Sequence, residues 1–187
     1  MSQSPSWCPQ TFLDTYLFAA EAHRGQTVPG TQGLSYILHL STVAMEVCAA
    51  LTVEDFERPN LGMQCALLHD VIEDTDTTYE QVAQRFGDDV ARGVMALTKD
   101  EGLPKPEAMA DSLQRIRDCS PEVWAVKLAD RITNLQKPPA KWSPEKRTYY
   151  VNEADIILAQ LGDASAYLRE RLRLKIVEYR SQHCGSD

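Results

Sequence analysis

The chain has 187 residues, of which 43% are hydrophobic and 25% charged, and this size and composition are typical of one globular domain with its own core. Its formal net charge of −8 argues against a general nucleic-acid binder, which would need a basic face. No apolar run approaches the roughly 18 residues that a membrane span requires, so we expect no membrane association.

Apolar residues recur at helical spacing along most of the chain, and no segment shows the two-residue alternation of a β-strand. Thr78 followed by Gln81 resembles a capping box, and the sequence Ser-Pro-Glu at 120–122 and again at 143–145 is a typical helix start. In chain order, the sequence predicts helices over residues 12–26, 36–51, 61–71, 78–86, 88–97, 106–118, 121–135, 144–161 and 165–181. We therefore expect one all-α domain over residues 1–187, with a core of about 10–180, built from some eight or nine helices.

The stretch LLHDVIEDTD at 67–76 is unusually rich in acids. It places His69, Asp70, Glu73, Asp74 and Asp76 within eight residues, directly after an apolar run. On a continuous helix, the first three of these would share one face. Acids this close repel one another unless a cation compensates them, so the stretch predicts a metal site, with an acidic helix end in water as the alternative.

Two further polar residues interrupt apolar helix faces. His39 lies in the helix predicted over 36–51, and Asp130 lies in VKLADRITNL at 126–135, with Asn134 one turn later on the same face. A buried carboxylate must be paired or bound to a cation. Two imidazoles and two carboxylates would suit Mn²⁺, Fe²⁺, Zn²⁺ or Mg²⁺. Glu73 and Asp74 could then orient or deprotonate a water molecule.

These residues carry a resemblance to a known family. The pattern His39, His69-Asp70 and Asp130 resembles the signature of HD-domain metal-dependent phosphohydrolases. More narrowly, the sequences at 22–26 (AHRGQ), 35–39 (SYILH), 67–75 (LLHDVIEDT), 96–100 (ALTKD) and 126–135 (VKLADRITNL) resemble the alarmone hydrolase domain of the RelA/SpoT family. Because the chain is too short to add the family's synthetase and regulatory domains, it resembles the stand-alone small alarmone hydrolases.

The resemblance implies an all-helical enzyme that uses one Mn²⁺ ion to remove the 3′-pyrophosphate from ppGpp or pppGpp. It implies that four side chains bind the ion: His39, His69, Asp70 and Asp130. It also implies that Glu73 and Asp74 handle the attacking water and that Asn134 faces the ribose and phosphates of the nucleotide. Tyr150 and Lys146 match substrate-contacting positions less closely, and an ordinary amphipathic helix is the alternative for both.

The chain departs from the family where the base is bound. An Arg-Lys pair usually follows the HxGQ motif, whereas Thr27, Val28 and Pro29 follow it here, in a loop about two residues longer. Arg24 is the nearest substitute for the cation that stacks on the base. Guanine is therefore the default, and adenine alarmones such as pppApp are nearly as well supported. The alternatives are an HD phosphohydrolase acting on NADPH or a nucleoside monophosphate, and a catalytically silent nucleotide-binding module.

The five cysteines include no CxxC pair, and the first residues lack the pattern of a signal peptide. A disulfide framework or a zinc knuckle is therefore not expected. These features predict a cytoplasmic protein.

Overall fold

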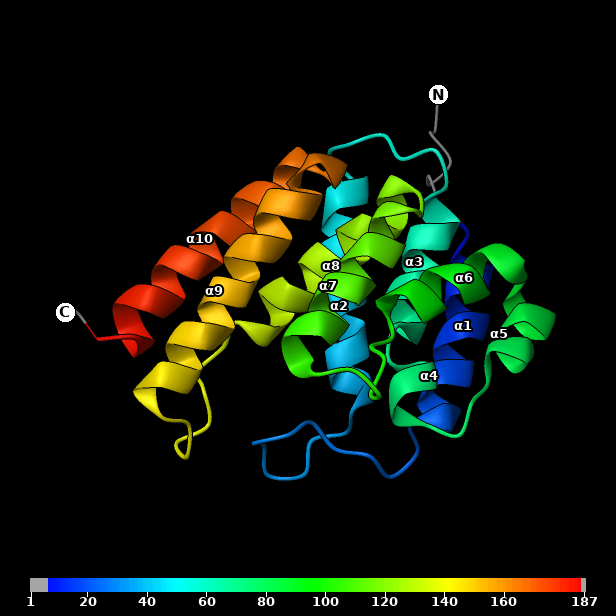
Figure 1. Cartoon of the computed structure of the whole chain (residues 1–187). Coiled ribbons are helices and arrows are strands. Elements are labelled where there is room, and N and C mark those ends of the chain that lie inside the picture. The colour runs from blue at the N-terminus through cyan, green and yellow to red at the C-terminus, as the bar shows by residue number, and fades with distance from the viewer. Residues whose placement is uncertain (1–6, 186–187) are drawn as a thin grey trace.

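The computed structural model describes residues 7–185, apart from the side chain of Lys105, and Figure 1 shows them as an assembly of helices. Within this range there is no β-strand, only an isolated bridge between Thr27 and Ser35. In chain order, the helices are α1 (Pro9–Ala22), α2 (Ile37–Leu51), α3 (Pro59–Leu68), α4 (Val71–Asp74), α5 (Tyr79–Phe86), α6 (Asp88–Leu97), α7 (Lys105–Arg117), α8 (Pro121–Asn134), α9 (Pro144–Leu161), the 3₁₀ helix η1 (Gly162–Ala164) and α10 (Ala166–His183). The prediction of an all-α fold is confirmed.

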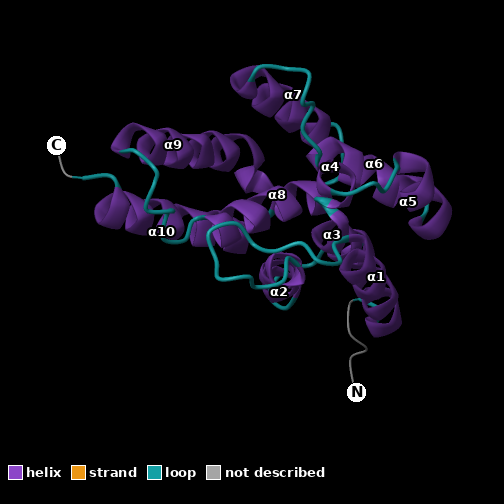
Figure 2. Ribbon diagram, turned by 90° about the horizontal axis from the view of Figure 1, so that it is seen from below, coloured by secondary structure: helices purple, strands orange, loops and turns teal. Residues whose placement is uncertain are grey.

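Helices α2, α3 and α8 pack against one another and form the centre of the fold. Helices α9 and α10 pack together on one side of α8, and α5 and α6 lie on the other (Figures 1 and 2). Leu40, Leu67 and Leu128, one from each central helix, are fully buried in a single hydrophobic cluster. Any polar side chain on the inner faces of these three helices is therefore withdrawn from water.

Several helix ends follow from local signals in the sequence. The capping box at the start of α5 is present, because the Thr78 side chain accepts from the Gln81 backbone and Gln81 reaches back to Thr78. Ser143 caps α9 in the expected way. Gly87 has a φ of 93°, a value that L side chains rarely adopt, and it ends α5 and leads directly into α6. Among the described helices, none is long and apolar enough to cross a membrane.

The helix predicted over 61–71 is wrong at its end. Helix α3 stops at Leu68, and the single-turn helix α4 begins at Val71, so His69 and Asp70 lie at the junction. Asp70 has a φ of −102° and a ψ of −1°, outside regular helical geometry. As a result, the faces predicted for an unbroken helix do not apply beyond this point, and α4 carries its acids in a new direction.

Candidate metal centre

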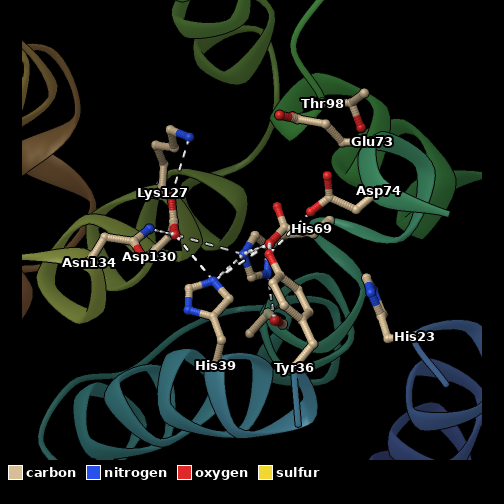
Figure 3. Close-up of polar contacts among 12 residues, drawn as sticks. His23, Tyr36, His39, His69, Glu73, Asp74, Thr98, Lys127, Asp130 and Asn134 are labelled. Atoms are coloured by element: carbon tan, nitrogen blue, oxygen red, sulfur yellow. Dashed lines mark hydrogen bonds and ion pairs between the residues drawn. The ribbon is translucent and has the colours of Figure 1, made fainter. Parts of the chain in front are cut away.

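Three central elements bring four polar side chains to one buried point (Figure 3). His39 comes from α2, His69 and Asp70 from the junction after α3, and Asp130 from α8. The Nε2 atoms of the two histidines are 3.2 Å apart, and Asp70 Oδ2 is 3.0 Å from His69 Nε2 and 3.5 Å from His39 Nε2. Asp130 Oδ1 lies 3.5 Å from His39 Nε2 and 3.8 Å from His69 Nε2. The four predicted ligands therefore converge.

Neighbouring groups hold these side chains in place. Nδ1 of His69 is 2.9 Å from the carbonyl oxygen of Ala66, so it donates a proton there, and Nε2 is the nitrogen directed at the cluster. Asn134 donates to Asp130 Oδ1 at 2.5 Å, and the ammonium of Lys127 lies 3.4 Å from Oδ2. Such outer partners fix ligand orientation in metal sites generally.

The charges in the cluster shift the pKa values of its own side chains. Burial alone would favour neutral His69, but the carboxylates of Asp70 and Asp130 outweigh it and raise the pKa of this imidazole to about 9. Burial likewise opposes ionisation of Asp70, but the charge of His69 and hydrogen bonds from His39 and Tyr36 hold its carboxyl pKa well below the usual range. For Asp130, Lys127 and the imidazoles overcome burial and lower the pKa. Without a metal, the cluster is thus a salt bridge held by a proton on His69.

The residues present fit a divalent cation. His39, His69 and Asp70 form a group whose potential ligand atoms all lie within 4.8 Å of one another, and Asp130 Oδ1 lies beside both imidazoles. Two nitrogen and two oxygen donors suit a borderline or hard ion better than a soft one. The tautomer of His69 is the one that a metal ligand requires.

Glu73 and Asp74 lie one turn further on, in α4 (Figure 3), and make different contacts. Glu73 Oε2 accepts from the backbone N–H of Lys99 at 2.9 Å, and the Lys99 ammonium is 3.4 Å from Oε1. Asp74 Oδ2 accepts from the Tyr36 hydroxyl at 3.2 Å. Burial, followed by the charge of Asp70, raises the pKa of the Asp74 carboxyl above its usual value. Glu73 is therefore anchored, whereas the carboxylate of Asp74 is more basic than that of an ordinary aspartate.

The residues predicted to contact substrate are not all in one place. Asn134 lies against the cluster through its bond to Asp130. Arg24 is largely exposed at the end of α1 and forms an ion pair with Glu21. Arg24 thus lies at the surface, and its contact with the base of a nucleotide stays a prediction.

Tyr150 and Lys146 lie on α9. The Arg131 guanidinium carbon lies 4.4 Å from the centre of the Tyr150 ring, and Arg131 directly follows Asp130 in α8. Lys146 is exposed, with its ammonium 4.6 Å from the centre of the Trp142 ring. The structure thus connects Tyr150 to the cluster through one neighbouring residue and places Lys146 further out on an aromatic surface.

Sequence reasoning missed several residues around the cluster. Tyr36, which donates to Asp70 Oδ2 at 2.5 Å, was not singled out, and neither was Lys127. His23 is buried and stacks on Tyr36, with ring centres 4.9 Å apart. The signal was available, because His23 lies in AHRGQ and Tyr36 in SYILH, two of the segments that carry the family resemblance.

Comparison with known proteins decides the family. Residues 15–165 match the family model described as the HD domain, which is most of the chain. The chain belongs to the HD domain family. All four converging side chains lie within the matched residues.

Among related HD proteins, a guanosine-3′,5′-bis(diphosphate) 3′-pyrophosphohydrolase, MESH1, from Danio rerio is 36% identical over 170 residues, covering 89% of this chain and 92% of the relative. Its counterpart from Homo sapiens is 34% identical, covering 86% and 90%. The bifunctional (p)ppGpp synthase/hydrolase SpoT of Escherichia coli is 37% identical over 155 residues, which is 79% of this chain but 20% of SpoT.

A solved structure extends this similarity to three dimensions. It is described as a metazoan ortholog of SpoT that hydrolyses ppGpp. It matches with a TM-score of 0.77 at 30% identity and covers 97% of this chain and 98% of its own. The chain and this protein therefore share one fold over almost their whole lengths.

Proposed function

We propose that this HD domain hydrolyses the 3′-pyrophosphate of (p)ppGpp. The observation that carries the proposal is the convergence of His39, His69, Asp70 and Asp130 beside the acids of α4. Relatives that are 36% and 34% identical over about nine tenths of their own lengths bear the name of this activity. A catalytically silent module would be expected to lack some of these groups.

In the proposed reaction, a water oxygen bonds to the phosphorus attached to the 3′ oxygen, and the bond from that phosphorus to the 3′ oxygen breaks. Pyrophosphate leaves, and a 3′-hydroxyl remains on the nucleoside. The four ligands would hold one divalent ion, for which we propose Mn²⁺. When bound, such an ion supplies positive charge that polarises the phosphoryl group.

The two acids of α4 have separate tasks in this proposal. Asp74 accepts a proton of the attacking water, because its raised pKa makes its carboxylate a better base than an ordinary aspartate. Glu73 orients the water, because the backbone N–H and the ammonium of Lys99 hold its carboxylate in one position. Asn134 both orients Asp130 and lies on the side of the cluster where we place the nucleotide.

The base is a separate question, and adenine alarmones are our second candidate substrate. Residues 27–34, which follow the HxGQ motif, contain no charged side chain. Arg24 is paired with Glu21 at the surface. A stacking cation is worth about 0.5–2 kcal/mol, so its loss would weaken the preference for guanine without affecting the metal. We place Tyr150 and Lys146 in the outer part of the nucleotide site.

The test is a substrate panel. Purified protein is incubated with Mn²⁺ and ppGpp, pppGpp, pppApp or NADPH, with and without EDTA, and the products are separated by ion-exchange chromatography. We expect pyrophosphate from ppGpp, no turnover in EDTA, and loss of activity in Glu73→Ala and Asp74→Ala. Asp76→Ala is the matched control, an acid of the same segment that should keep wild-type activity. Inorganic phosphate as the sole product, or turnover of NADPH alone, would contradict the proposal.

A further inference from the structure

The hydroxyl of Tyr36 lies between two acids that the proposed reaction uses differently. It is 2.5 Å from Asp70 Oδ2 and 3.2 Å from Asp74 Oδ2. The first oxygen belongs to the metal cluster, and the second belongs to the acid proposed to accept the proton of water (Figure 3). A carboxylate oxygen has two lone pairs, so Asp70 Oδ2 can bind a cation and still accept from Tyr36.

A second layer holds the tyrosine itself. The buried ring of His23 stacks on the Tyr36 ring at an interplanar angle of 22°. Gln26 joins this histidine to α4, because its Oε1 is 2.7 Å from His23 Nδ1 and its Nε2 is 2.6 Å from the backbone carbonyl oxygen of Asp74. A carbonyl oxygen can only accept, so the Gln26 amide donates there and its own oxygen accepts from His23 Nδ1–H. The side chains form one connected unit from α1 to α4.

Gln26 and Tyr36 also hold together the two ends of the loop formed by residues 28–34. The Tyr36 backbone N–H donates to the Gln26 carbonyl at 3.0 Å, and Thr27 and Ser35 form the isolated bridge next to it. The two ends of this loop are therefore fixed relative to each other, whatever conformation residues 28–34 adopt. This explains how the loop can differ in length and charge while the cluster remains complete.

We propose that Tyr36, held by His23 and Gln26, is a positioning residue that fixes Asp70 and Asp74 relative to each other. By fixing Asp70, Tyr36 strengthens metal binding, and this part does not depend on which substrate the protein hydrolyses. By fixing Asp74, it raises kcat, and this part rests on the proposed function. Without the hydroxyl, Asp70 Oδ2 loses an outer partner, and such losses in metal sites typically cost about 10- to 100-fold in affinity or activity.

The test uses Tyr36→Phe, which keeps the ring and its stacking on His23 and removes only the hydroxyl. Mn²⁺ alone is titrated into the metal-free protein by calorimetry, and kcat and KM are measured for ppGpp at saturating Mn²⁺. We expect Mn²⁺ binding about 10-fold or more weaker and a comparable fall in kcat, with KM unchanged. Tyr16→Phe is the matched control, a half-buried tyrosine of α1 whose hydroxyl accepts from Ser41, at 3.5 Å, instead of serving the acids.

Gln26→Leu tests the outer layer and is independent of any change at the phenol. Like Tyr36→Phe, it should lower kcat. The melting temperature of the metal-free protein should stay close to that of the Tyr16→Phe control. Wild-type Mn²⁺ affinity in Tyr36→Phe, or wild-type kcat in Gln26→Leu, overturns the inference. If the wild-type protein turns over no alarmone, the proposed function fails, and the Mn²⁺ titration of Tyr36→Phe still decides the role of Tyr36.

Discussion

Metal binding at this cluster should compete with a proton. The pKa of His69 in the metal-free protein is about 9, so at pH 7 the imidazole carries a proton that Mn²⁺ must displace. The carboxyls of Asp70 and Asp130 have lowered pKa values and are already ionised. With a pKa about two units above the working pH, competition weakens apparent Mn²⁺ binding by about 100-fold, or roughly 3 kcal/mol. Affinity should rise about tenfold per pH unit from pH 6 to pH 8.

Calorimetry in buffers of different ionisation enthalpy measures this directly. At pH 7, the slope of observed enthalpy against buffer enthalpy should give about one proton released per Mn²⁺ bound. His183→Gln, at the end of α10, is the matched control and should release the same number. The raised pKa of His69 also stabilises the metal-free fold. This contribution is fully present below about pH 6.5, the ordinary pKa of a histidine, and is lost as the pH rises through about 9. Mn²⁺ affinity that is flat between pH 6 and pH 8, with no proton released, would refute the reasoning.

Three substitutions test the surroundings of the site by urea unfolding. Lys127→Met leaves the buried carboxylate of Asp130 short of a cation and should destabilise the metal-free protein by about 3 kcal/mol, with Mn²⁺ recovering much of the loss; equal losses with and without Mn²⁺ would contradict this. Gly93→Ala would place a Cβ 2.7 Å from Cys65 Sγ and should cost about 1–3 kcal/mol without changing Mn²⁺ affinity, whereas a gain in stability would show that the core yields. Glu122→Ala removes the buried carboxylate that accepts from the backbone N–H of Arg58, the residue just before α3, so we expect a loss of about 1–2 kcal/mol at unchanged kcat; wild-type stability would show that water replaces the carboxylate.

The helices were largely predictable because their signals are local. A capping box at Thr78 and a Ser-Pro start at Ser143 act within one turn, and both are present in the structure. The break at His69 and Asp70 was not predictable in this way. His69 keeps helical backbone angles and Asp70 leaves them, and no proline or glycine at these positions marks the change in the sequence.

The four converging side chains were predictable for a different reason. His39 and Asp130 interrupt apolar faces, and an uncompensated carboxylate is expensive to bury, so each indicates a missing partner even in a linear sequence. Tyr36 gave no such signal, because an aromatic residue at the start of a helix is ordinary core material. Its role depends on the distance between its hydroxyl and acids 34 and 38 positions away.

The proposed function requires that an acidic protein bind an anionic substrate at this cluster. In the metal-free state, the charges of Asp70 and Asp130 are matched by Lys127 and by the proton on His69. Exchange of that proton for a divalent ion adds one positive charge at the same buried point. The Lys99–Glu73 pair nearby is neutral as a unit. Counted together with ionised Asp74, these side chains carry one net negative charge without the metal. A divalent ion would bring them to neutrality and remove the repulsion that a phosphate group would otherwise meet in a chain with a net charge of −8.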